Sequence, residues 1–495
     1  YAVGETTAEA ARELGMTVVA QGQGGLQGVL GQLDPAHRRL LRLAGEERIA
    51  LMERIVAELK KRAGDLAVSM SKEMGAPISF ASTAQVGAGI GGFMGTLEAL
   101  KEFNFTEQAG AAKVVYEPIG VVGLITPWNW PLNQIALKVA PCIAAGNTMI
   151  LKPSEECPGN AAIFAEIMHA AGVPAGVFNL VQGDGPTVGE AISSHPGIDM
   201  VSFTGSTRAG ILVAKAAAET VKRVHQELGG KSPNLVLPGA DLQATLPATV
   251  SGVWINSGQS CISPARILVH KDQEAEAIGV IKGIMESIPV GDPLSEGGHI
   301  GPVVNKAQYE KIQGLIQSGI DEGAKLETGG TGLPTNVNRG FYVKPTVFSG
   351  VTRNMRIAKE EVFGPVATIM AYEDLDQAIE IAAQIIKEMR SGFSPDVMVA
   401  GVGVAIPGQV RLADGVVRHA PHLNWIEAPF GAKLAQLTGL PVYLDNDASL
   451  GCMAEYNFGA ARGFNDVVYV FAGSGGIGGG AIVNGRQLRG AAGYA

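Results

Sequence analysis

The chemistry of this sequence centres on a cysteine that ends a short polar segment. Residues 256–261 read NSGQSC, and Cys261 is one of only 4 cysteines in 495 residues. A structural cysteine usually lies among aliphatic side chains, whereas here Asn, Ser, Gly and Gln precede the sulfur. We therefore expect Cys261 to be presented on one side of the protein rather than packed into a core.

The other cysteines carry no comparable signal. Cys142, Cys157 and Cys452 form no CxxC pair with each other or with Cys261 and have no regular spacing, so neither a disulfide scaffold nor a zinc cluster is indicated. We expect these three side chains to be buried, no metal site in the chain, and a reducing, cytoplasmic environment.

Composition bounds the class of protein. A chain of 495 residues has room for about three domains, and 46% hydrophobic residues with 67 glycines indicate an α/β enzyme. The net charge of −9 argues against a nucleic-acid-binding surface over the whole molecule. No apolar run reaches the ~18 residues of a membrane span, and the first residues lack the features of a signal peptide. The chain begins without Met, as a fragment or a processed product would.

The middle of the chain alternates between strand-like and helix-like segments. Apolar runs such as VGLIT (122–126), TMIL (148–151), FNLV (178–181) and MVSFT (200–204) each precede a turn and a helical pattern. This alternation predicts a parallel sheet with helices on its faces, whose ligands bind beyond the carboxyl ends of the strands. The segment GAGIGG at 87–92 matches a dinucleotide-binding pattern, but no strand precedes it. We interpret its small residues as a site of close helix packing.

The first 46 residues form a compact βαβ-like beginning. The positions Val3, Gly4, Thr7 and Ala8 resemble the VG-x-x-TA turn and helix of uroporphyrinogen-III synthase, and RLLRLAGEER continues the likeness. The alternative is an ordinary βα unit with no chemistry of its own.

From about residue 47 to 383 the chain resembles the NAD(P)-dependent aldehyde dehydrogenase superfamily. The segments that carry the resemblance, in the order of that family, are TPWNWP (126–131), KPSE (152–155), GDGPTVG (183–189), FTGST (203–207), ELGGKSPN (227–234), NSGQSC (256–261) and EEVFGPV (360–366). The resemblance implies a Rossmann-type cofactor domain, an α/β catalytic domain, and the oxidation of an aldehyde to a carboxylic acid through a cysteine thiohemiacetal and thioester.

The resemblance assigns roles that are chemically reasonable. Cys261 would be the nucleophile, because a thiolate adds to a carbonyl faster than water does. The side-chain amide of Asn129 and the backbone N–H of Cys261 would stabilise the oxyanion that this attack creates. Glu227 would be the general base for hydrolysis of the thioester, and we expect partial burial to raise its pKa. Taken alone, Glu227 would be read as a solvated carboxylate at a helix end.

Cofactor residues follow from the same resemblance. Lys152 and Glu155 would contact the adenosine ribose, and a carboxylate there favours NAD over NADP, although Lys152 suits either. Gly205 and Ser206 would place the pyrophosphate at a helix N-terminus. Further positions that the resemblance assigns to the cofactor are Gly185, Gly189, Glu361 and Phe363. Trp128 is either a wall of the substrate channel or a core residue.

After about residue 383 the sequence instead resembles the middle of a ROK-family sugar kinase or repressor, built on an actin-like ATPase fold. Asn424, Asn446 and Asp447 would lie near a sugar, with Asp447 as the base. The glycine run 473–480 follows a strand and would bring backbone N–H groups to a phosphate. The first phosphate motif, the zinc motif and a helix-turn-helix are absent, which makes kinase and repressor activity improbable.

We therefore divide the chain into a uroporphyrinogen-III synthase-like fragment (1–46), an NAD-binding domain (47–228), a truncated catalytic domain (229–383) and a ROK-like fragment (384–495). Neither junction has a Pro/Gly/Ser-rich linker, which indicates an assembled sequence rather than a natural fusion. The leading function is NAD-dependent aldehyde oxidation, with no nucleic-acid or membrane partner and a possible homo-oligomer. The alternatives are a ROK-type sugar-binding module and an inactive chimera.

Overall fold

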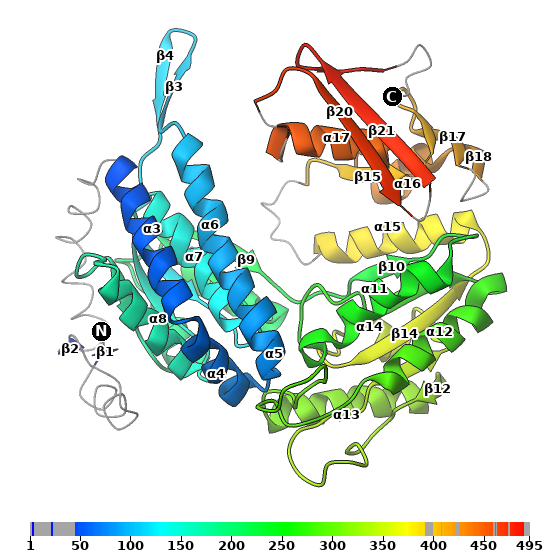
Figure 1. Ribbon diagram of the computed structural model, residues 1–495, viewed down its shortest axis with the longest axis horizontal. Helices are drawn as coiled ribbons and strands as arrows, with labels where there is room; N and C mark the ends of the chain where they lie inside the picture. The colour runs from blue at the N-terminus through cyan, green and yellow to red at the C-terminus, as the bar shows by residue number, and fades with distance from the viewer. Residues whose placement is uncertain are drawn as a thin grey trace.

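The protein is described by a computed structural model covering residues 2–3, 21–22, 45–391, 399–406, 408–420, 425–458, 461, 463–473 and 476–489. Figure 1 shows a helix-rich part coloured blue to cyan, a second part in green and yellow, and a C-terminal part in orange and red. Most of the segment that resembles uroporphyrinogen-III synthase, including Gly4, Thr7 and Ala8, lies outside the described residues. Its described strands are the short parallel pair β1 (Ala2–Val3) and β2 (Gln21–Gly22).

Five parallel strands form the first sheet, in the spatial order β7-β6-β5-β8-β9. Their bounds are β5 Val121–Ile125, β6 Thr148–Lys152, β7 Phe178–Leu180, β8 Met200–Thr204 and β9 Arg223–Glu227. The central strands are buried because helices cover both faces. The strand order reverses between β5 and β8, so the crevice beyond their carboxyl ends is the expected place for a ligand.

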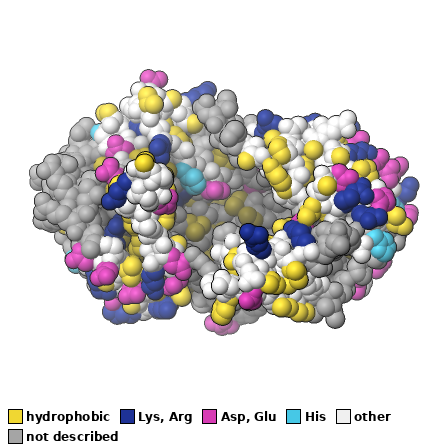
Figure 2. All heavy atoms as spheres, turned by 90° about the horizontal axis from the view of Figure 1, so that it is seen from above, with side chains coloured by type: hydrophobic (Ala, Val, Ile, Leu, Met, Phe, Trp, Pro, Cys, Tyr) yellow, Lys and Arg dark blue, Asp and Glu magenta, His cyan; other side chains and the backbone are white. Residues whose placement is uncertain are grey.

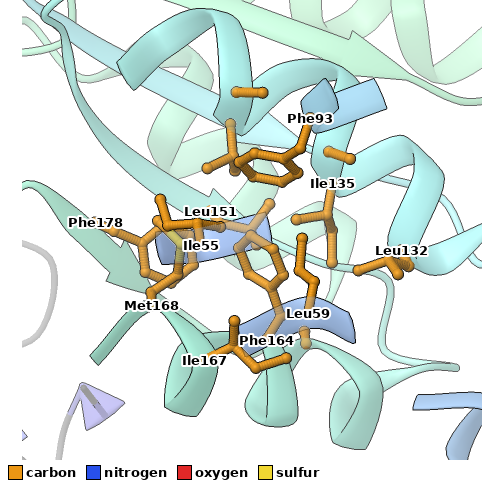
Figure 3. Close-up of a cluster of buried hydrophobic side chains, with 14 of the residues drawn as sticks. Ile55, Leu59, Phe93, Leu132, Ile135, Leu151, Phe164, Ile167, Met168 and Phe178 are labelled. Carbon is orange, nitrogen blue, oxygen red and sulfur yellow. The ribbon is translucent and has the colours of Figure 1, made fainter. Parts of the chain in front are cut away.

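Helices pack on both sides of this sheet (Figure 1). Their bounds are α3 Gly45–Lys61, α4 Ala63–Met74, α5 Ile78–Phe80, η1 Ala81–Gln85, α6 Val86–Glu102, α7 Pro131–Ala144, α8 Pro158–Ala170, η2 Gly185–Gly189, α9 Glu190–Ser194 and α10 Thr207–Ala218. Figure 3 shows the core between them, where Phe164 lies between Phe93 and Phe178 at ring-centroid distances of 6.0 and 5.5 Å.

The glycine-rich segment 87–92 lies inside helix α6, in agreement with the prediction that it packs between helices because no strand precedes it. A Cβ on Gly89 would lie 2.4 Å from Cγ of Leu132 in helix α7. The two helices therefore approach closely only because residue 89 has no side chain. The interpretation of this segment as a packing element is confirmed.

The second sheet has the spatial order β10-β11-β14-β13-β12. Its strands are β10 Pro233–Leu235, β11 Arg266–His270, β12 Lys325–Thr328, β13 Thr346–Ser349 and β14 Val366–Tyr372. Its strand pairs are parallel except that between β12 and β13. The accompanying helical elements are α11 Leu242–Trp254, η3 Ile255–Gly258, η4 Lys271–Gln273, α12 Glu274–Ser287, α13 Lys306–Asp321 and α14 Arg356–Lys359.

A single helix, α15 (Leu375–Ser391), crosses the position near residue 383 where the resemblance changes. Its residues Ile379 and Ala383 are buried in one cluster with Val417 and Leu434 of the C-terminal part. Leu237, which follows strand β10, is partly buried against the same cluster. The junction is therefore a packed helix rather than a linker.

The C-terminal part contains short sheets and two helices. Their bounds are β15 Val402–Ile406, β16 Gln409–Arg411, β17 Val416–Ala420, β18 Trp425–Ala428, α16 Phe430–Thr438, β19 Val442–Asn446, α17 Asp447–Phe458, β20 Val467–Gly473, β21 Gly476–Val483 and β22 Arg486–Gln487. Strand β15 pairs with β19 in parallel, and the other strand pairs of this part are antiparallel.

The glycine run 473–480 lies where strands β20 and β21 meet, and its contact with a phosphate stays a prediction. Gly473 ends β20 and pairs with Gly476 at the start of β21, so the described glycines of this run lie in two antiparallel strands. A Cβ on Gly480 would lie 2.6 Å from Cβ of Cys452 in α17. The glycines allow the helix to pack closely on the hairpin.

The surface is uneven on the side shown in Figure 2, where it is hollowed between the lobe that carries the β3–β4 hairpin and the C-terminal lobe. Among the described strands, β3 (Thr106–Ala109) and β4 (Ala112–Val115) pair only with each other, and they project from the body (Figure 1). Among the described helices, none combines the length and the apolar character needed to cross a bilayer.

Candidate active site

The nucleophile candidate follows a sharp reversal of the chain between α11 and β11. Asn256, Ser257 and Gly258 have consecutive positive φ angles of 55°, 55° and 74°. A Cβ on Gly258 would lie 2.1 Å from the carbonyl carbon of Gly364, so only glycine fits there. Two adjacent non-glycine residues in the left-handed region each cost on the order of 1–3 kcal/mol, and surrounding contacts must hold them.

The polar side chains of this segment are buried rather than exposed to solvent. Asn256, Ser257, Gln259 and Ser260 are all buried, with 1–5% of their surface exposed. Cys261 is half-buried, and it is the only one of the 4 cysteines that is not fully buried. The segment thus leaves Cys261 partly exposed, in agreement with its expected presentation, while its buried polar residues hold the backbone.

A buried network of amides holds the segment in place. The side chain of Asn129 donates from Nδ2 to the carbonyl oxygen of Gln259 over 3.1 Å. Asn256 donates from Nδ2 to the same oxygen over 3.1 Å and to the Asn129 carbonyl oxygen over 2.8 Å. Gln85 donates from Nε2 to that Asn129 oxygen over 3.1 Å and to Oδ1 of Asn256 over 3.0 Å.

Aromatic side chains flank this network. Trp130 donates from Nε1 to Oγ of Ser260 over 2.9 Å, which ties the residue before Cys261 to the start of helix α7. Trp128 meets the ring of Phe363 edge to face, with ring centroids 5.5 Å apart. Trp128 also packs partly against the first hydrophobic core, which agrees with the core role considered for it, whereas its role as a wall of the substrate channel stays a prediction.

The surroundings of Cys261 disfavour its ionised form. Burial raises the pKa of the Cys261 thiol, and the carboxylates of Glu361 and Glu227 raise it further. In the protein without substrate or cofactor, Cys261 is therefore largely a protonated thiol at neutral pH. Its activation requires a proton acceptor or a change in the charge around it.

The structure corrects the expected environment of Glu227. This residue ends strand β9, and 68% of its side chain is exposed. The expected partial burial is wrong, because Glu227 shares the more exposed face of β9 with Arg223 and His225, and β9 is the edge strand among the described strands of this sheet. The Glu227 carboxylate is nevertheless close enough to act electrostatically on Cys261.

A chain of polar groups leads from the interior of the first sheet to Glu227. Lys138 donates from Nζ to Oγ of Ser202 over 2.9 Å, and that oxygen lies 3.2 Å from Nδ1 of His225. Nε2 of His225 lies 3.9 Å from Oε1 of Glu227. Burial lowers the pKa of Lys138 to about 8, while the Glu227 carboxylate acts in the opposite direction.

The glycines after Glu227 permit close contacts with the site. Gly230 donates its N–H to Oε1 of Glu361 over 3.0 Å. A Cβ on Gly229 would lie 2.6 Å from Oε2 of Glu361, and one on Gly230 would lie 2.7 Å from the carbonyl oxygen of Cys261. Burial raises the pKa of Glu361. The two glycines thus bring a carboxylate from the second sheet close to the cysteine turn.

The proposed adenosine-ribose residues lie together at the carboxyl end of β6. Lys152 is buried and donates from Nζ to Oε2 of Glu155 over 3.1 Å and to the carbonyl oxygen of Pro153 over 2.8 Å. The Glu155 side chain is 54% exposed. An accessible carboxylate can accept hydrogen bonds from both hydroxyl groups of a ribose, so this pair fits the proposed role.

The proposed pyrophosphate residues lie beyond β8. Ser206 is the N-cap of α10 and accepts a hydrogen bond from the N–H of Ala209 over 3.3 Å. A Cβ on Gly205 would lie 2.6 Å from Cζ of Phe203, so the backbone there stays bare. Gly185 is exposed at the start of η2, and Gly189 is buried at its end. These features fit a dinucleotide laid across the carboxyl ends of β5, β6 and β8.

The proposed sugar residues of the C-terminal part take structural roles where they are described. Asn446 donates from Nδ2 to the carbonyl oxygen of Gly408 over 2.9 Å and accepts from the N–H of Ser449 over 3.0 Å. Asp447 begins helix α17. Asn424 lies outside the described residues. The sugar site at Asn424, Asn446 and Asp447 stays a prediction.

The other cysteines behave as expected, since Cys142, Cys157 and Cys452 are all buried. Sequence reasoning missed Gln85, Lys138 and His225. Gln85 lies 171 residues before its partner Asn256, so no local pattern indicated it. Lys138 is an isolated lysine in an apolar helix, and that isolation was the available signal.

Two family models match the chain. The model described as the aldehyde dehydrogenase family matches residues 32–386, and that of the ROK family matches residues 351–495. The first match begins inside the segment for which a uroporphyrinogen-III synthase piece was expected, and none of the matches supports that expectation. The ROK resemblance of the C-terminal part agrees with the second match.

Curated relatives and solved structures agree with the larger match. The chain is 48% identical over 342 residues to a 3-succinoylsemialdehyde-pyridine dehydrogenase of a Pseudomonas species, covering 69% of this chain and 72% of the relative. An aldehyde dehydrogenase structure from Bartonella henselae has a TM-score of 0.72 and 41% identity, covering 84% and 82% of the two chains. A mutant of aldehyde dehydrogenase C from Pseudomonas syringae, in complex with NAD+ and octanal, has a TM-score of 0.73 and 38% identity, covering 93% and 88%. The chain belongs to the aldehyde dehydrogenase family.

Proposed function

We propose that this protein oxidises an aldehyde to a carboxylic acid with NAD, and that Cys261, Asn129 and Glu227 carry out the reaction. The observation that supports the assignment most is the connection between Asn129 and the cysteine turn. The Asn129 amide is hydrogen-bonded to the residue two before Cys261, and the Cys261 thiol lies within electrostatic reach of Glu227 and Glu361.

In the first step the Cys261 sulfur adds to the aldehyde carbonyl carbon, and the thiol proton passes to a base. Glu227 is the base that we assign to this step, because its carboxylate is exposed to solvent and acts electrostatically on the Cys261 thiol. The carbonyl oxygen becomes an oxyanion. One N–H of the Asn129 amide is held by Gln259, and the second, with the backbone N–H of Cys261, is available to this oxyanion.

NAD, when bound, supplies the two-electron acceptor of the oxidation. The residues that would hold it are Lys152 and Glu155 at the adenosine ribose, Gly205 and Ser206 at the pyrophosphate, and Glu361 at the nicotinamide ribose. The exposed Glu155 carboxylate favours a ribose that bears no 2′-phosphate, and so favours NAD over NADP. Gly185, Gly189 and Phe363 complete the proposed cofactor site.

In the last step a water attacks the thioester on Cys261, and its proton passes to Glu227. The carbon–sulfur bond breaks, the carboxylic acid leaves, and the Cys261 thiol is restored. An exposed carboxylate can exchange its proton with solvent directly, which the position of Glu227 at the sheet edge allows.

The function is tested by NADH formation with a panel of short aliphatic, aromatic and semialdehyde substrates. The panel includes a pyridine semialdehyde, because the name of the Pseudomonas relative describes such a substrate. The purified wild type should form NADH with at least one aldehyde, and Cys261→Ala should form none. Cys452→Ala, which alters a buried cysteine in the C-terminal part, is the matched control and should retain activity. Activity in Cys261→Ala, or none in the wild type, would refute the assignment.

We also propose a homo-oligomer that uses the projecting β3–β4 hairpin. Val114, Val115 and Tyr116 are 39%, 56% and 44% exposed on a two-stranded ribbon, which is marginally stable by itself. Light scattering on the purified protein should give a multiple of 51.3 kDa. The double variant Val115→Glu/Tyr116→Glu should reduce the mass to that of a monomer, and an unchanged mass would contradict this interface.

A further inference from the structure

Gln85 occupies an unusual position between two helices. It ends the π-helical segment η1 (Ala81–Gln85), and its side chain is fully buried. π-helical turns are uncommon and often occur beside functional sites. From this turn the Gln85 amide reaches the loop after strand β5 and the turn before strand β11, which belong to different sheets.

The direction of each hydrogen bond is fixed by backbone carbonyl groups. The carbonyl oxygen of Asn129 can only accept, so Gln85 must present its amide nitrogen. Asn256 faces the carbonyl oxygens of Asn129 and Gln259 with its nitrogen, and its Oδ1 must therefore face Gln85. Both N–H bonds of Gln85 are thus used, one on each side of the proposed site.

The side-chain carbonyl oxygen of Gln85 has no comparable role. This atom, Oε1, is buried and has no hydrogen-bond partner among the described residues. Leaving a buried acceptor unpaired is unfavourable, so the benefit of glutamine at this position lies in its two donors. Those donors end on the main chain of Asn129 and on the side chain of Asn256, which adopts the strained left-handed conformation.

We propose that Gln85 is a positioning residue for the oxyanion site of this enzyme, holding the Asn129 amide and the Cys261 turn at a fixed separation. This inference rests on the proposed function. Gln85 touches neither Cys261 nor a bound substrate, and it acts through Asn129 and Asn256. Its effect should appear in the rate of the chemical step rather than in substrate or cofactor binding.

The inference is tested with two variants that differ in the number of donors. Gln85→Met preserves length and removes both donors. Gln85→Glu preserves shape, and its buried carboxyl group, facing two acceptor oxygens, should be protonated and retain one donor. A positioning role predicts that kcat falls in the order wild type, Gln85→Glu, Gln85→Met. A role in packing alone predicts the reverse order for the variants, because a buried methionine is tolerated better than a buried glutamate.

The expected size is a decrease in kcat of about tenfold to 100-fold for Gln85→Met, with KM and the NAD dissociation constant within about twofold of wild type. The matched control is Asn179→Leu. Asn179 is also buried, and it donates from Nδ2 to the carbonyl oxygens of Met149 and Gly176 over 3.1 and 2.8 Å, in the first sheet. This control should lose thermal stability but keep kcat.

A second measurement requires no turnover. The alkylation rate of Cys261 by iodoacetamide in the cofactor-free protein, followed by peptide mass spectrometry, should change at least threefold in Gln85→Met and stay unchanged in Asn179→Leu. Failure of the proposed function would appear as an inactive wild type, while the alkylation comparison still tests Gln85. Equal alkylation rates in wild type, Gln85→Met and Asn179→Leu would overturn the inference, as would an unchanged kcat.

Discussion

The side-chain amide of Asn129 donates a hydrogen bond to the carbonyl oxygen of Gln259 across 130 positions of sequence. Asn129 follows strand β5 of the first sheet, and Gln259 precedes strand β11 of the second. The bond therefore joins the two sheets at the point where Cys261 emerges. A group that must meet a developing oxyanion within about 3 Å needs such a fixed connection.

Removal of the Asn129 amide should reduce catalysis without abolishing binding. Asn129→Ala is expected to lower kcat about 10²- to 10³-fold, because loss of one oxyanion donor typically has that effect. KM should change less than kcat. Asn133→Ala, in the same helix α7, is the control and should remain within about twofold of wild type. Steady-state kinetics measure kcat and KM for both variants. A change confined to the KM of Asn129→Ala would argue against a role of Asn129 in stabilising the oxyanion.

The reactivity of Cys261 should depend on the charge of Glu361. Because this carboxylate raises the pKa of the thiol, Glu361→Gln should lower that pKa and increase the thiolate fraction near neutral pH. The pH profile of iodoacetamide alkylation in the cofactor-free protein should shift to lower pH in this variant. Glu360→Gln, which removes an exposed carboxylate paired with Arg356, is the control and should leave the profile in place. A shift to higher pH in Glu361→Gln would contradict the assignment.

Lys138 should make stability rise with pH in alkaline solution. Its pKa is lowered from 10.5 to about 8, so the unfolded chain binds more protons than the folded one between these values. At pH 7 the buried ammonium charge lowers the free energy of unfolding by up to about 3 kcal/mol, and the hydrogen bond to Ser202 offsets part of this loss. Lys138→Met should therefore unfold at a higher urea concentration at pH 7, with the gain shrinking between pH 8 and 10.5.

The exposed Lys215→Met is the control for this comparison and should show no such pH-dependent gain. A gain of Lys138→Met that grows as the pH rises would show that the sign is wrong.

Gly258 should tolerate no side chain. Gly258→Ala places a Cβ in the left-handed region, 2.1 Å from the backbone of Gly364, so the cysteine turn must move. We expect loss of activity and destabilisation of more than about 2 kcal/mol. Gly279→Ala is the matched control, because residue 279 lies inside helix α12 with open space around it, and alanine should stabilise it by up to about 1 kcal/mol. Equal melting temperatures for the two variants would contradict this account of the turn.

Periodicity and turn residues were sufficient to predict the first sheet. The apolar runs before Thr126, Lys152 and Gly205 form β5, β6 and β8, because residues buried on both faces of a parallel sheet leave a continuous apolar pattern. The packing role of Gly89 was also predictable, since no strand precedes it. These inferences needed only local sequence.

Contacts between distant segments could not be predicted in the same way. Gln85 and Asn256 meet only after both sheets have formed, and neither residue type is unusual in its own segment. The exposure of Glu227 depends on which elements cover its face of β9, and no local pattern indicates that. The close approach of Gly480 to Cys452 likewise depends on tertiary structure, which the glycine run alone does not indicate.

The central claim is that an acyl group resides on Cys261 during turnover, and trapping that thioester tests it most directly. In Glu227→Gln both proton transfers lose their base, so the test is made at alkaline pH, where the Cys261 thiol, freed of the Glu227 charge that raises its pKa, ionises without a base. Thioester formation should then proceed while its hydrolysis stays slow, so an aldehyde substrate with NAD should give one equivalent of NADH and an acyl adduct on the peptide that contains Cys261. Mass spectrometry of the quenched protein measures the adduct. The account predicts an adduct at Cys261 that is absent without NAD. NADH formation with no adduct at Cys261, or with the adduct at another residue, would contradict it.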